Sequence, residues 1–562
     1  MALNKLHVSW ISGITLIMCL ITPLLNNALL PPSCMEKQWH FFYLSWMLFV
    51  PALSLGLVYS GEETKKNLPL FLTIGLLLTG TYEIIEGIRQ LSGATLSAHS
   101  LFAVTGTFYN PGPYSGYLAI VFPLCFFLLL KRKSVPLYAN ILLWIVTILF
   151  LSMMLTSMSR SAWIAVIAST SYIWMAYRKP MPCLAASFRA NPLRNTLLSI
   201  LLLVFLALLA VCVFLLKENS AIGRILIWKI SLSTIMQAPL TGYGYHSFER
   251  IYGAAQETYF SILPHHPGEA WVADTPEYAF NEYLQLAMEW GIPALCLAVS
   301  GLVLSLRAWH RNKQYGLAGS VIAIAVFAFT SYPLRIPGLL SATLLLIVAG
   351  WVTALPLVKK HLIHTVAFIS VACAASYYCY REYKVAEKHE NTLYSWYDGH
   401  KAYMKGNYEK AMQIYIPLYD DMRWNANYLL ELGRCLQQSD RYYESLHLLL
   451  AAETLSANTA ILDLIGMNYQ SIGCYEKAEE YFIRSSCRVP SRITPYYLLA
   501  RLYAHPCNYH PQKAARMAGE VLSRKPKVDS EVVENMKKEA RRILEMQKQT
   551  VKQDESNKSS HE

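Results

Sequence analysis

From Leu6 to about Tyr380 the chain alternates between long apolar runs and short polar stretches, and from about Glu382 to Glu562 it is charged and rich in tyrosine. A helix needs roughly 20 largely apolar residues to cross a bilayer, and open strands would leave backbone groups unpaired there. Eleven runs approach this length, centred near residues 16, 49, 75, 122, 146, 168, 206, 299, 324, 346 and 370. The pattern predicts an all-α fold with a polytopic membrane helix bundle of about 11 spans at residues 1–380. A soluble helical domain at residues 390–545 and a disordered polar tail at residues 546–562 would follow.

The charges in the loops orient these spans. The first apolar run has no small-residue cleavage site soon after it, so we expect a spanning helix rather than a removed signal peptide. With the N-terminus in the cytoplasm, the inward loops are all basic: Gly61–Asn67, Lys131–Lys133, Arg178–Arg194, Arg307–Lys313 and Lys359–His361. The outward loops carry few positive charges: Pro31–His40, Glu86–Tyr114, Ser157–Ser161, Lys217–Glu282 and Ser331–Pro337. This positive-inside alternation predicts a multi-pass inner-membrane protein whose C-terminal domain lies in the periplasm of a Gram-negative cell.

Two outward loops are long enough to carry a function. Residues 217–282 and residues 86–114 form the longest connections between predicted spans. Long loops in a compact protein are usually functional. We therefore expect an active site that faces the periplasm.

The C-terminal domain repeats a short pattern built around a tyrosine. Gly406–Ala411, Arg441–Ser445 and Gly473–Ala478 share it, and a weaker copy begins at Asn508. The equivalent tyrosines, at positions 408, 442, 475 and 509, are separated by 34, 33 and 34 residues. This is the tetratricopeptide period, in which each unit is a pair of antiparallel helices and stacked units form a solenoid. Such an array would recognise a protein partner, or would only stiffen the periplasmic face.

Charge and cysteine content add limits. The net charge of +12 would suit nucleic acid, but many basic residues lie in short loops between apolar runs, so we expect no nucleic-acid partner. Four cysteines lie in the soluble part: Cys435, Cys474, Cys487 and Cys507. They form no C-x-x-C pair, so zinc and thioredoxin-like chemistry have no support, whereas a disulfide among them remains open for an exported domain.

Four polar segments lie near the predicted outer surface. They are Thr105–Tyr114, Ser157–Trp163, Gly223–Lys229 with Pro239–Phe248, and Phe280–Pro293. In the second, Arg160 would either snorkel at the membrane boundary or pair bidentately with a diphosphate. In the third, Arg224 and Lys229 add outward positive charge, while Tyr243 and Tyr245 offer rings for sugar stacking.

These segments, in this order, resemble the O-antigen ligase superfamily. The shared motifs are Gly-Thr-Phe-x-Asn-Pro with Asn110, Ser-Arg-Ser-Ala, Arg-x-x-x-Trp, Gly-x-Gly-x-x-x-Phe and Asn-Glu-Tyr-Leu-Gln-(x)5-Gly-Ile, across roughly residues 70–355. That superfamily includes lipopolysaccharide ligases, O-antigen polymerases and protein O-oligosaccharyltransferases. The resemblance implies a GT-C-like, metal-independent, inverting glycosyltransferase without a cofactor. Its donor would be a glycan on undecaprenyl diphosphate, with Arg160, Arg224 and Lys229 holding the diphosphate and Asn110, Tyr243 and Tyr245 contributing to the substrate loops.

One position departs from the pattern of many ligases. Phe280 stands where these have a histidine just before Asn281. Glu282 would then serve as the base, with Asn281 beside it, or would only complement the dipole of a helix start. His265, His266 and Asp274 are rival bases in the same loop. The run from His265 to Glu269 has no common metal-site spacing, so we expect no metal.

Several readings remain open. The acceptor would be lipid A–core oligosaccharide, another glycan repeat, or a serine or threonine of a protein. A transporter would need polar groups near the bilayer midplane and repeated helices, and no internal repeat is visible among the spans. A membrane-anchored scaffold is the other non-enzyme alternative, although an anchor needs one span rather than eleven.

Overall fold

The computed structural model describes residues 5–25, 35–131, 136–179, 190, 193–197, 200–201, 218–262, 267–355 and 362–559. Every regular element in these ranges is a helix, which confirms the predicted all-α class. The chain divides into two compact units. The first unit comprises Met1–Leu216, Phe280–Leu286 and Pro293–Leu393, and the second comprises Lys217–Ala279, Ala287–Ile292 and Tyr394–Glu562. The outward loop that the sequence assigns to the membrane domain therefore groups with the C-terminal repeats.

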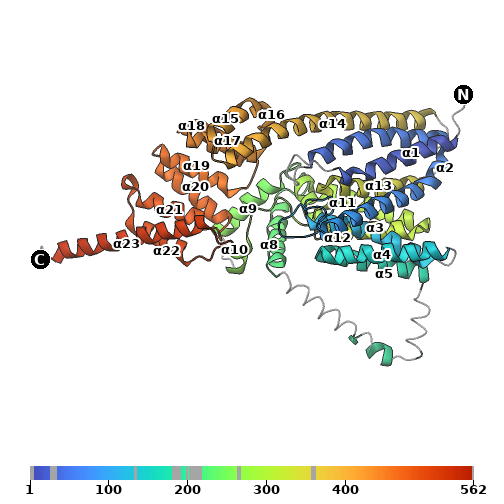
Figure 1. The fold of residues 1–562 in the computed structure, drawn as a ribbon, viewed down its shortest axis with the longest axis horizontal. Helices are drawn as coiled ribbons and strands as arrows, with labels where there is room; N and C mark the ends of the chain where they lie inside the picture. The colour runs from blue at the N-terminus through green and yellow to red at the C-terminus, as the bar shows by residue number, and fades with distance from the viewer. Residues whose placement is uncertain are drawn as a thin grey trace. The chain divides into compact units, whose positions relative to one another are not determined.

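The first unit is a bundle of apolar helices (Figure 1). Its helices are α1 (Lys5–Leu20), α2 (Glu36–Leu91), α3 (Pro111–Lys131), α4 (Leu137–Thr156), α5 (Arg160–Arg178), most of α11 (Glu282–Arg311), α12 (Tyr315–Ala328), α13 (Pro337–Ala354) and the first part of α14 (Leu362–Met404). Two short 3-10 turns, η1 (Thr22–Leu24) and η3 (Pro333–Arg335), complete it. The described helices α2, α3, α4, α11 and α13 are long and apolar enough to cross a membrane, and α1 and α12 contain shorter apolar helices. Eleven spans stay a prediction, and the span centred near residue 206 lies outside the described residues at 202–217.

Helix α2 covers two of the predicted spans. Its backbone leaves helical geometry at Ser60 (φ −138°, ψ 40°), so two helical segments meet there. Residues 61–67, for which the sequence predicts a loop, are helical instead. The side chains of Ser60 and Thr64 both donate hydrogen bonds to the carbonyl of Gly56, which satisfies backbone groups at the break.

Burial orders the helices of the first unit. In α3, 83% of the apolar stretch is buried, against 22% in α4, so α3 is central and α4 has the exposed surface expected of a lipid-facing helix. Small residues bring α3, α5 and α12 together. A side chain at Gly319 of α12 would approach Ile173 of α5 to 2.6 Å, and one at Gly116 of α3 would overlap Phe327. Close backbone approach at small residues is typical of helix packing in membranes.

The second unit joins three helices of the outward loop to the C-terminal helices. The loop contributes α8 (Glu218–Ile235), α9 (Phe248–Ile262) and α10 (Pro267–Val272). The C-terminal part contributes the end of α14, then α15 (Tyr408–Tyr415), η4 (Ile416–Leu418), α16 (Tyr419–Met422), α17 (Ala426–Gln438), α18 (Tyr442–Glu453), α19 (Thr459–Ser471), α20 (Tyr475–Arg488), α21 (Thr494–Ala504), η5 (Pro506–Asn508), α22 (Pro511–Ser523) and α23 (Glu531–Ser559).

The predicted repeat period coincides with the starts of helices. Helices α15, α18 and α20 begin at Tyr408, Tyr442 and Tyr475. Consecutive helices pack in pairs, α17 on α18, α19 on α20 and α21 on α22. Glycines allow the close contact within a pair: a side chain at Gly433 would approach Leu449 to 2.9 Å. Paired helices at this period support the tetratricopeptide assignment, which stays a prediction.

Two further expectations concern the C-terminal part. The described cysteines there, Cys435, Cys474, Cys487 and Cys507, are free thiols, so none of the disulfides left open by the sequence is formed. The backbone of α23 is helical to Ser559, where the composition predicts a disordered tail. Lysine, glutamine and glutamate are good helix formers, which accounts for helical geometry in a segment with little to bury.

Candidate functional site

The Gly-Thr-Phe motif of the first unit is held by two buried polar side chains of α2. The Glu83 carboxylate accepts hydrogen bonds from the backbone N–H of Thr107 (3.0 Å) and from its hydroxyl (2.5 Å). The Gln90 amide oxygen accepts from the N–H groups of Thr105 (2.8 Å) and Gly106 (2.9 Å). Glu83 is fully buried, and Gly106 has a positive φ of 57° that only glycine adopts readily. These contacts fix the turn that precedes α3.

Asn110, predicted in the substrate loop, caps α3. Its side-chain oxygen accepts a hydrogen bond from the N–H of Gly112 at 3.0 Å. This is a local turn that satisfies a backbone donor at a helix start. The structure thus gives Asn110 a role in shaping the loop.

Arg160 is the first residue of α5. Met158, in the left-handed region (φ 53°), makes the sharp turn out of α4, and the Ser161 hydroxyl donates a hydrogen bond to the carbonyl of Thr330 at 3.4 Å. A cation at a helix N-terminus is disfavoured by the helix dipole, whereas an anion there is favoured by the dipole and by unpaired N–H groups. Arg160 therefore stands at a helix start, beside backbone N–H groups that favour an anion.

Asn281 and Glu282 start helix α11 and are both buried. The Asn281 side chain accepts from the N–H groups of Tyr283 (3.0 Å) and Leu284 (3.2 Å), so it is the N-cap of the helix. The Glu282 carboxylate accepts a hydrogen bond of 2.6 Å from the N–H of Leu334 in η3. Phe280 (φ 49°) packs edge-on against Tyr332 at a centroid distance of 5.5 Å. The start of α11 is thus joined to the short turn that carries Arg335.

In the second unit, the cations of α8 are engaged differently. Lys229 pairs with Glu269 at 3.0 Å and donates to the Tyr259 hydroxyl at 2.7 Å. These hydrogen bonds raise the pKa of Lys229, which keeps it charged at neutral pH. The Trp228 indole donates to the carbonyl of Ala279 at 3.1 Å and so ties α8 to the end of the loop. Arg224 lies on α8, in the loop between the predicted spans.

The structure joins two motifs that the sequence separates. The N–H groups of Tyr243 and Gly244 donate to the carbonyls of Met288 and Glu289, both at 2.9 Å. The N–H of Ile292 donates to the carbonyl of Pro239 at 2.7 Å. Gly242 and Gly291 have φ values of 64° and 83°, and a side chain at Gly242 would approach the Glu289 carbonyl carbon to 2.5 Å. The two glycine motifs are therefore the two sides of one backbone crossing.

The remaining predicted residues lie at the surface or outside the described chain. Tyr243 donates its hydroxyl to the carbonyl of Thr234 at 3.2 Å, whereas Tyr245 is exposed and lies 6.0 Å from Trp290, ring centroid to ring centroid. Asp274, a rival base, is exposed and pairs with Lys527 at 3.6 Å. The other rival bases, residues 265 and 266, lie outside the described residues. Within the described ranges, no three His, Cys, Asp or Glu side chains are grouped so that they could hold a metal ion.

Each unit brings part of the predicted set together. Arg160, Asn110, Asn281 and Glu282 belong to the first unit, and Arg224, Lys229, Tyr243 and Tyr245 to the second. Sequence reasoning missed Glu83 and Gln90. The sequence could have singled out Glu83, because an ionisable residue within an apolar span usually has a functional or structural role.

The apolar helices define the class: a multi-pass membrane protein with a helical insertion between its spans. Residues 145–299 match the family model of the O-antigen ligase domain, which confirms the resemblance predicted from the motifs. The family indicates a membrane glycosyltransferase of the O-antigen ligase or polymerase type, acting on a lipid-linked glycan and an acceptor. Comparison with curated proteins gives no significant match.

Proposed function

We propose that the protein transfers a glycan from undecaprenyl diphosphate to an acceptor on the periplasmic side of the inner membrane. The observation that carries the proposal is the O-antigen ligase match over residues 145–299. This segment contains every predicted site residue except Asn110: Arg160, Arg224, Lys229, Tyr243, Tyr245, Asn281 and Glu282. The basic inward loops support the orientation.

In the proposed reaction, guanidinium groups bind the diphosphate. Arg160 supports this because it occupies a helix start, where the neighbouring N–H groups also favour an anion. Arg224 would supply a second planar fork for phosphate oxygens, and Lys229 a point charge. Positive charge aimed at the leaving group stabilises the charge that develops as the lipid diphosphate departs, so no metal ion is required in this scheme.

The bond changes are those of an inverting displacement. The acceptor hydroxyl oxygen bonds to the anomeric carbon while the bond from that carbon to the diphosphate oxygen breaks. The lipid diphosphate leaves with the electron pair, and the hydroxyl proton passes to a base. We assign the base to Glu282, because its carboxyl group is buried at the start of α11 and is held in place by a hydrogen bond from the N–H of Leu334.

The acceptor is the finer question. The helical repeats favour a process that involves a protein, either as acceptor or as partner of the assembly machinery. Ligation to lipid A–core remains our first assignment, because the motifs identify the superfamily. Polymerisation onto a second glycan and transfer to a protein hydroxyl are the alternatives.

Purified protein in lipid nanodiscs tests the reaction. With undecaprenyl-diphosphate glycan and each of the three acceptors, wild type should release undecaprenyl diphosphate with one acceptor. Arg160→Ala and Arg224→Ala should each reduce release by at least about a hundredfold while thermal stability is retained. Arg178→Ala is the matched control, because Arg178 ends the same helix that Arg160 begins. Full activity of the Arg160→Ala and Arg224→Ala variants would falsify the diphosphate assignment.

A further inference from the structure

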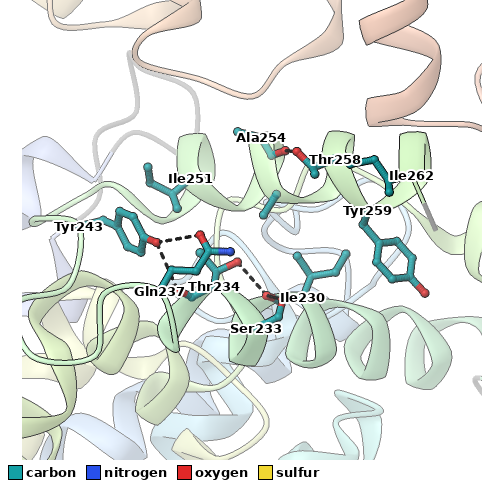
Figure 2. A pocket seen from close by; sticks show the side chains of 11 residues that line it. Ile230, Ser233, Thr234, Gln237, Tyr243, Ile251, Ala254, Thr258, Tyr259 and Ile262 are labelled. Carbon is teal, nitrogen blue, oxygen red and sulfur yellow. Dashed lines mark hydrogen bonds between the residues drawn. The ribbon is translucent and has the colours of Figure 1, made fainter.

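A cleft of about 560 Å³ lies between helices α8 and α9 of the second unit (Figure 2). Helix α8 and the turn after it line one side, and α9 lines the other. The lining residues are Ile230, Ser233, Thr234, Gln237, Tyr243, Ile251, Ala254, Ala255, Thr258, Tyr259 and Ile262. A cleft of this volume holds a drug-sized molecule, which is the size class of a disaccharide.

The chemistry of the lining points to a neutral, amphipathic ligand. Six of the eleven lining side chains carry a hydroxyl or an amide, five are aliphatic, and none is charged. None of the lining residues supplies a counter-charge for a diphosphate or an acidic peptide, and the cation next to the cleft, Lys229, is paired with Glu269 while it donates to the Tyr259 hydroxyl. A polyprenyl chain would have to desolvate the polar groups without replacing their hydrogen bonds. A pyranose has an apolar C–H face and a rim of hydroxyls, so it matches a lining of this composition.

Two tyrosines line the cleft, one toward each end. In Figure 2, Tyr243 and Tyr259 lie toward opposite ends of the space between the helices. The Tyr243 hydroxyl, which donates to the Thr234 carbonyl at 3.2 Å, also lies 3.4 Å from the Gln237 amide oxygen, so the Gln237 amide stands beside the ring with a nitrogen that can donate to a ligand hydroxyl. Aromatic rings present an apolar face with a polar tip, the arrangement that binds a sugar ring by stacking and by hydrogen bonding together.

One face of helix α9 lines the cleft, and other positions of the helix contact the C-terminal helices. Positions 251, 254, 255, 258, 259 and 262 face the cleft, whereas positions 249, 253, 256, 257 and 260 lie on other sides of the helix. Glu257 accepts from Arg484 at 2.8 Å and from Arg488 at 2.5 Å, both on α20. Gln256 donates to the carbonyl of Arg488 at 2.5 Å, and a side chain at Gly253 would overlap Ala457. The repeats thus hold one wall of the cleft in place.

We propose that this cleft binds a segment of a glycan chain, and that the repeats position its α9 wall. The inference rests on the proposed glycosyl transfer and places a sugar site next to Lys229, one of the residues proposed to hold the diphosphate. The chain in the cleft belongs either to the donor or to the acceptor, because both are built of sugars.

Kinetics of the full-length protein test the proposal. Tyr243→Ala should raise the KM of one glycan substrate by about three- to tenfold, the size expected for losing one aromatic contact, with kcat little changed. Tyr259→Ala should raise the same KM and also lower kcat, because it removes a hydrogen-bond partner of Lys229. Tyr243→Phe keeps the ring and should retain most of the affinity. Tyr443→Ala, an exposed tyrosine of the repeats, is the control and should have wild-type kinetics. A rise confined to the donor or to the acceptor identifies which chain occupies the cleft.

A binding measurement separates this proposal from the proposed function. The probe is the free oligosaccharide released by mild acid from the cell's own undecaprenyl-diphosphate pool, observed by saturation-transfer NMR on the nanodisc protein. Wild type should saturate the sugar C–H protons, and Tyr243→Ala and Tyr259→Ala should weaken the signal, with the Kd from a titration raised by about the same three- to tenfold. That result would stand even if wild type transferred no glycan. Unchanged KM values with unchanged saturation, or tyrosine-dependent binding of undecaprenyl phosphate alone, would overturn the glycan assignment.

Discussion

At the scale of single residues, two buried carboxylates of the first unit, Glu83 and Glu282, have different surroundings. Glu83 has no exposed surface and binds both the N–H and the hydroxyl of Thr107. Glu282 is also buried, but it stands at a helix start and bonds to the N–H of Leu334 in another segment. Glu83 therefore shapes a motif, whereas Glu282 lies where a base for the acceptor is proposed.

Replacing Glu83 should damage stability before chemistry. Glu83→Ala leaves the buried N–H of Thr107 without its acceptor, at a cost of roughly 1–3 kcal/mol, whereas the Thr107 hydroxyl keeps the Pro23 carbonyl as an acceptor. We expect a clear fall in thermal midpoint in detergent, with a smaller fall for Glu83→Gln, whose oxygen still accepts. Glu86→Ala is the control, because Glu86 pairs with the half-exposed Arg89 on the same helix. Equal midpoints for Glu83→Ala and wild type would show that the Thr107 contacts contribute nothing.

Replacing Glu282 should do the reverse. Glu282→Gln keeps an oxygen that can accept from Leu334 but cannot take up the acceptor's proton. We expect kcat to fall by about 10²–10⁴ with little change in thermal midpoint, and the residual rate to lose its dependence on a carboxyl titration. The measurement is undecaprenyl diphosphate release as a function of pH. Wild-type turnover by this variant would move the base to another residue.

What sequence reveals about such residues depends on distance along the chain. Arg160, Arg224 and Glu282 could be singled out because they belong to local motifs. The sequence does not show whether the side chains of Asn110 and Asn281 bond to the backbone or to a substrate, because the same residue type serves both purposes. Glu83 acts on a residue 24 positions away, and no local pattern encodes that contact.

At the scale of elements, periodicity was the most informative signal. The tyrosine spacing predicted a repeat of helix pairs, and α15, α18 and α20 begin at tyrosines of that series, although the tetratricopeptide assignment stays a prediction. Hydropathy located the apolar helices but not the continuity of α2, since a kink at Ser60 and a loop at residues 61–67 interrupt an apolar pattern in the same way. The crossing of residues 239–244 with 288–292 was also missed, because it is made by backbone hydrogen bonds, which do not depend on residue type except where the crossing requires a glycine.

Helix α19 contains an element-level pH response. Burial raises the pKa of Asp463 to about 6, against opposing effects of Ser485 and Arg492. Because the folded pKa lies above the unfolded value of 3.8, this carboxyl stabilises the repeats most below about pH 4, and the contribution is lost as the pH rises through 6. Asp463→Asn should therefore raise the free energy of unfolding at pH 7.5 by up to about 3 kcal/mol, and with it the thermal midpoint, and have little effect at pH 4. Circular dichroism melts at both pH values check this, and a gain of equal size at pH 4 would contradict the burial argument.

At the scale of the whole molecule, the outward loop and the repeats fold as one compact unit. The sequence places the loop in the membrane domain, since it lies between spans. The contacts that regroup it join residues 227 and 231 positions apart, from Glu257 to Arg484 and Arg488. Charge pairs at such a separation cannot be assigned from one sequence, because many arginines are available to one glutamate.

Breaking this attachment should loosen the loop. Glu257→Ala leaves Arg488, whose side chain is only 5% exposed, without its carboxylate, at a cost of about 3 kcal/mol. We expect faster hydrogen exchange in residues 248–262 and a higher glycan KM. Glu453→Ala is the matched control, because Glu453 pairs with Arg484 from within the repeats. Faster exchange in that control alone, or in neither variant, would show that α9 is held by other means.

The packing of α9 on two sides also limits which segments can be exchanged between related proteins. Because α9 packs against α20 through buried contacts, the side chains of residues 218–279 and of residues 394–562 must be complementary, as they are between two subunits of an obligate complex. A chimaera that exchanges only the C-terminal portion between relatives would separate Arg488 from Glu257, the carboxylate with which it pairs. Exchange of both segments together would keep the pair intact, so natural recombinants with a new sugar preference should carry them as one cassette.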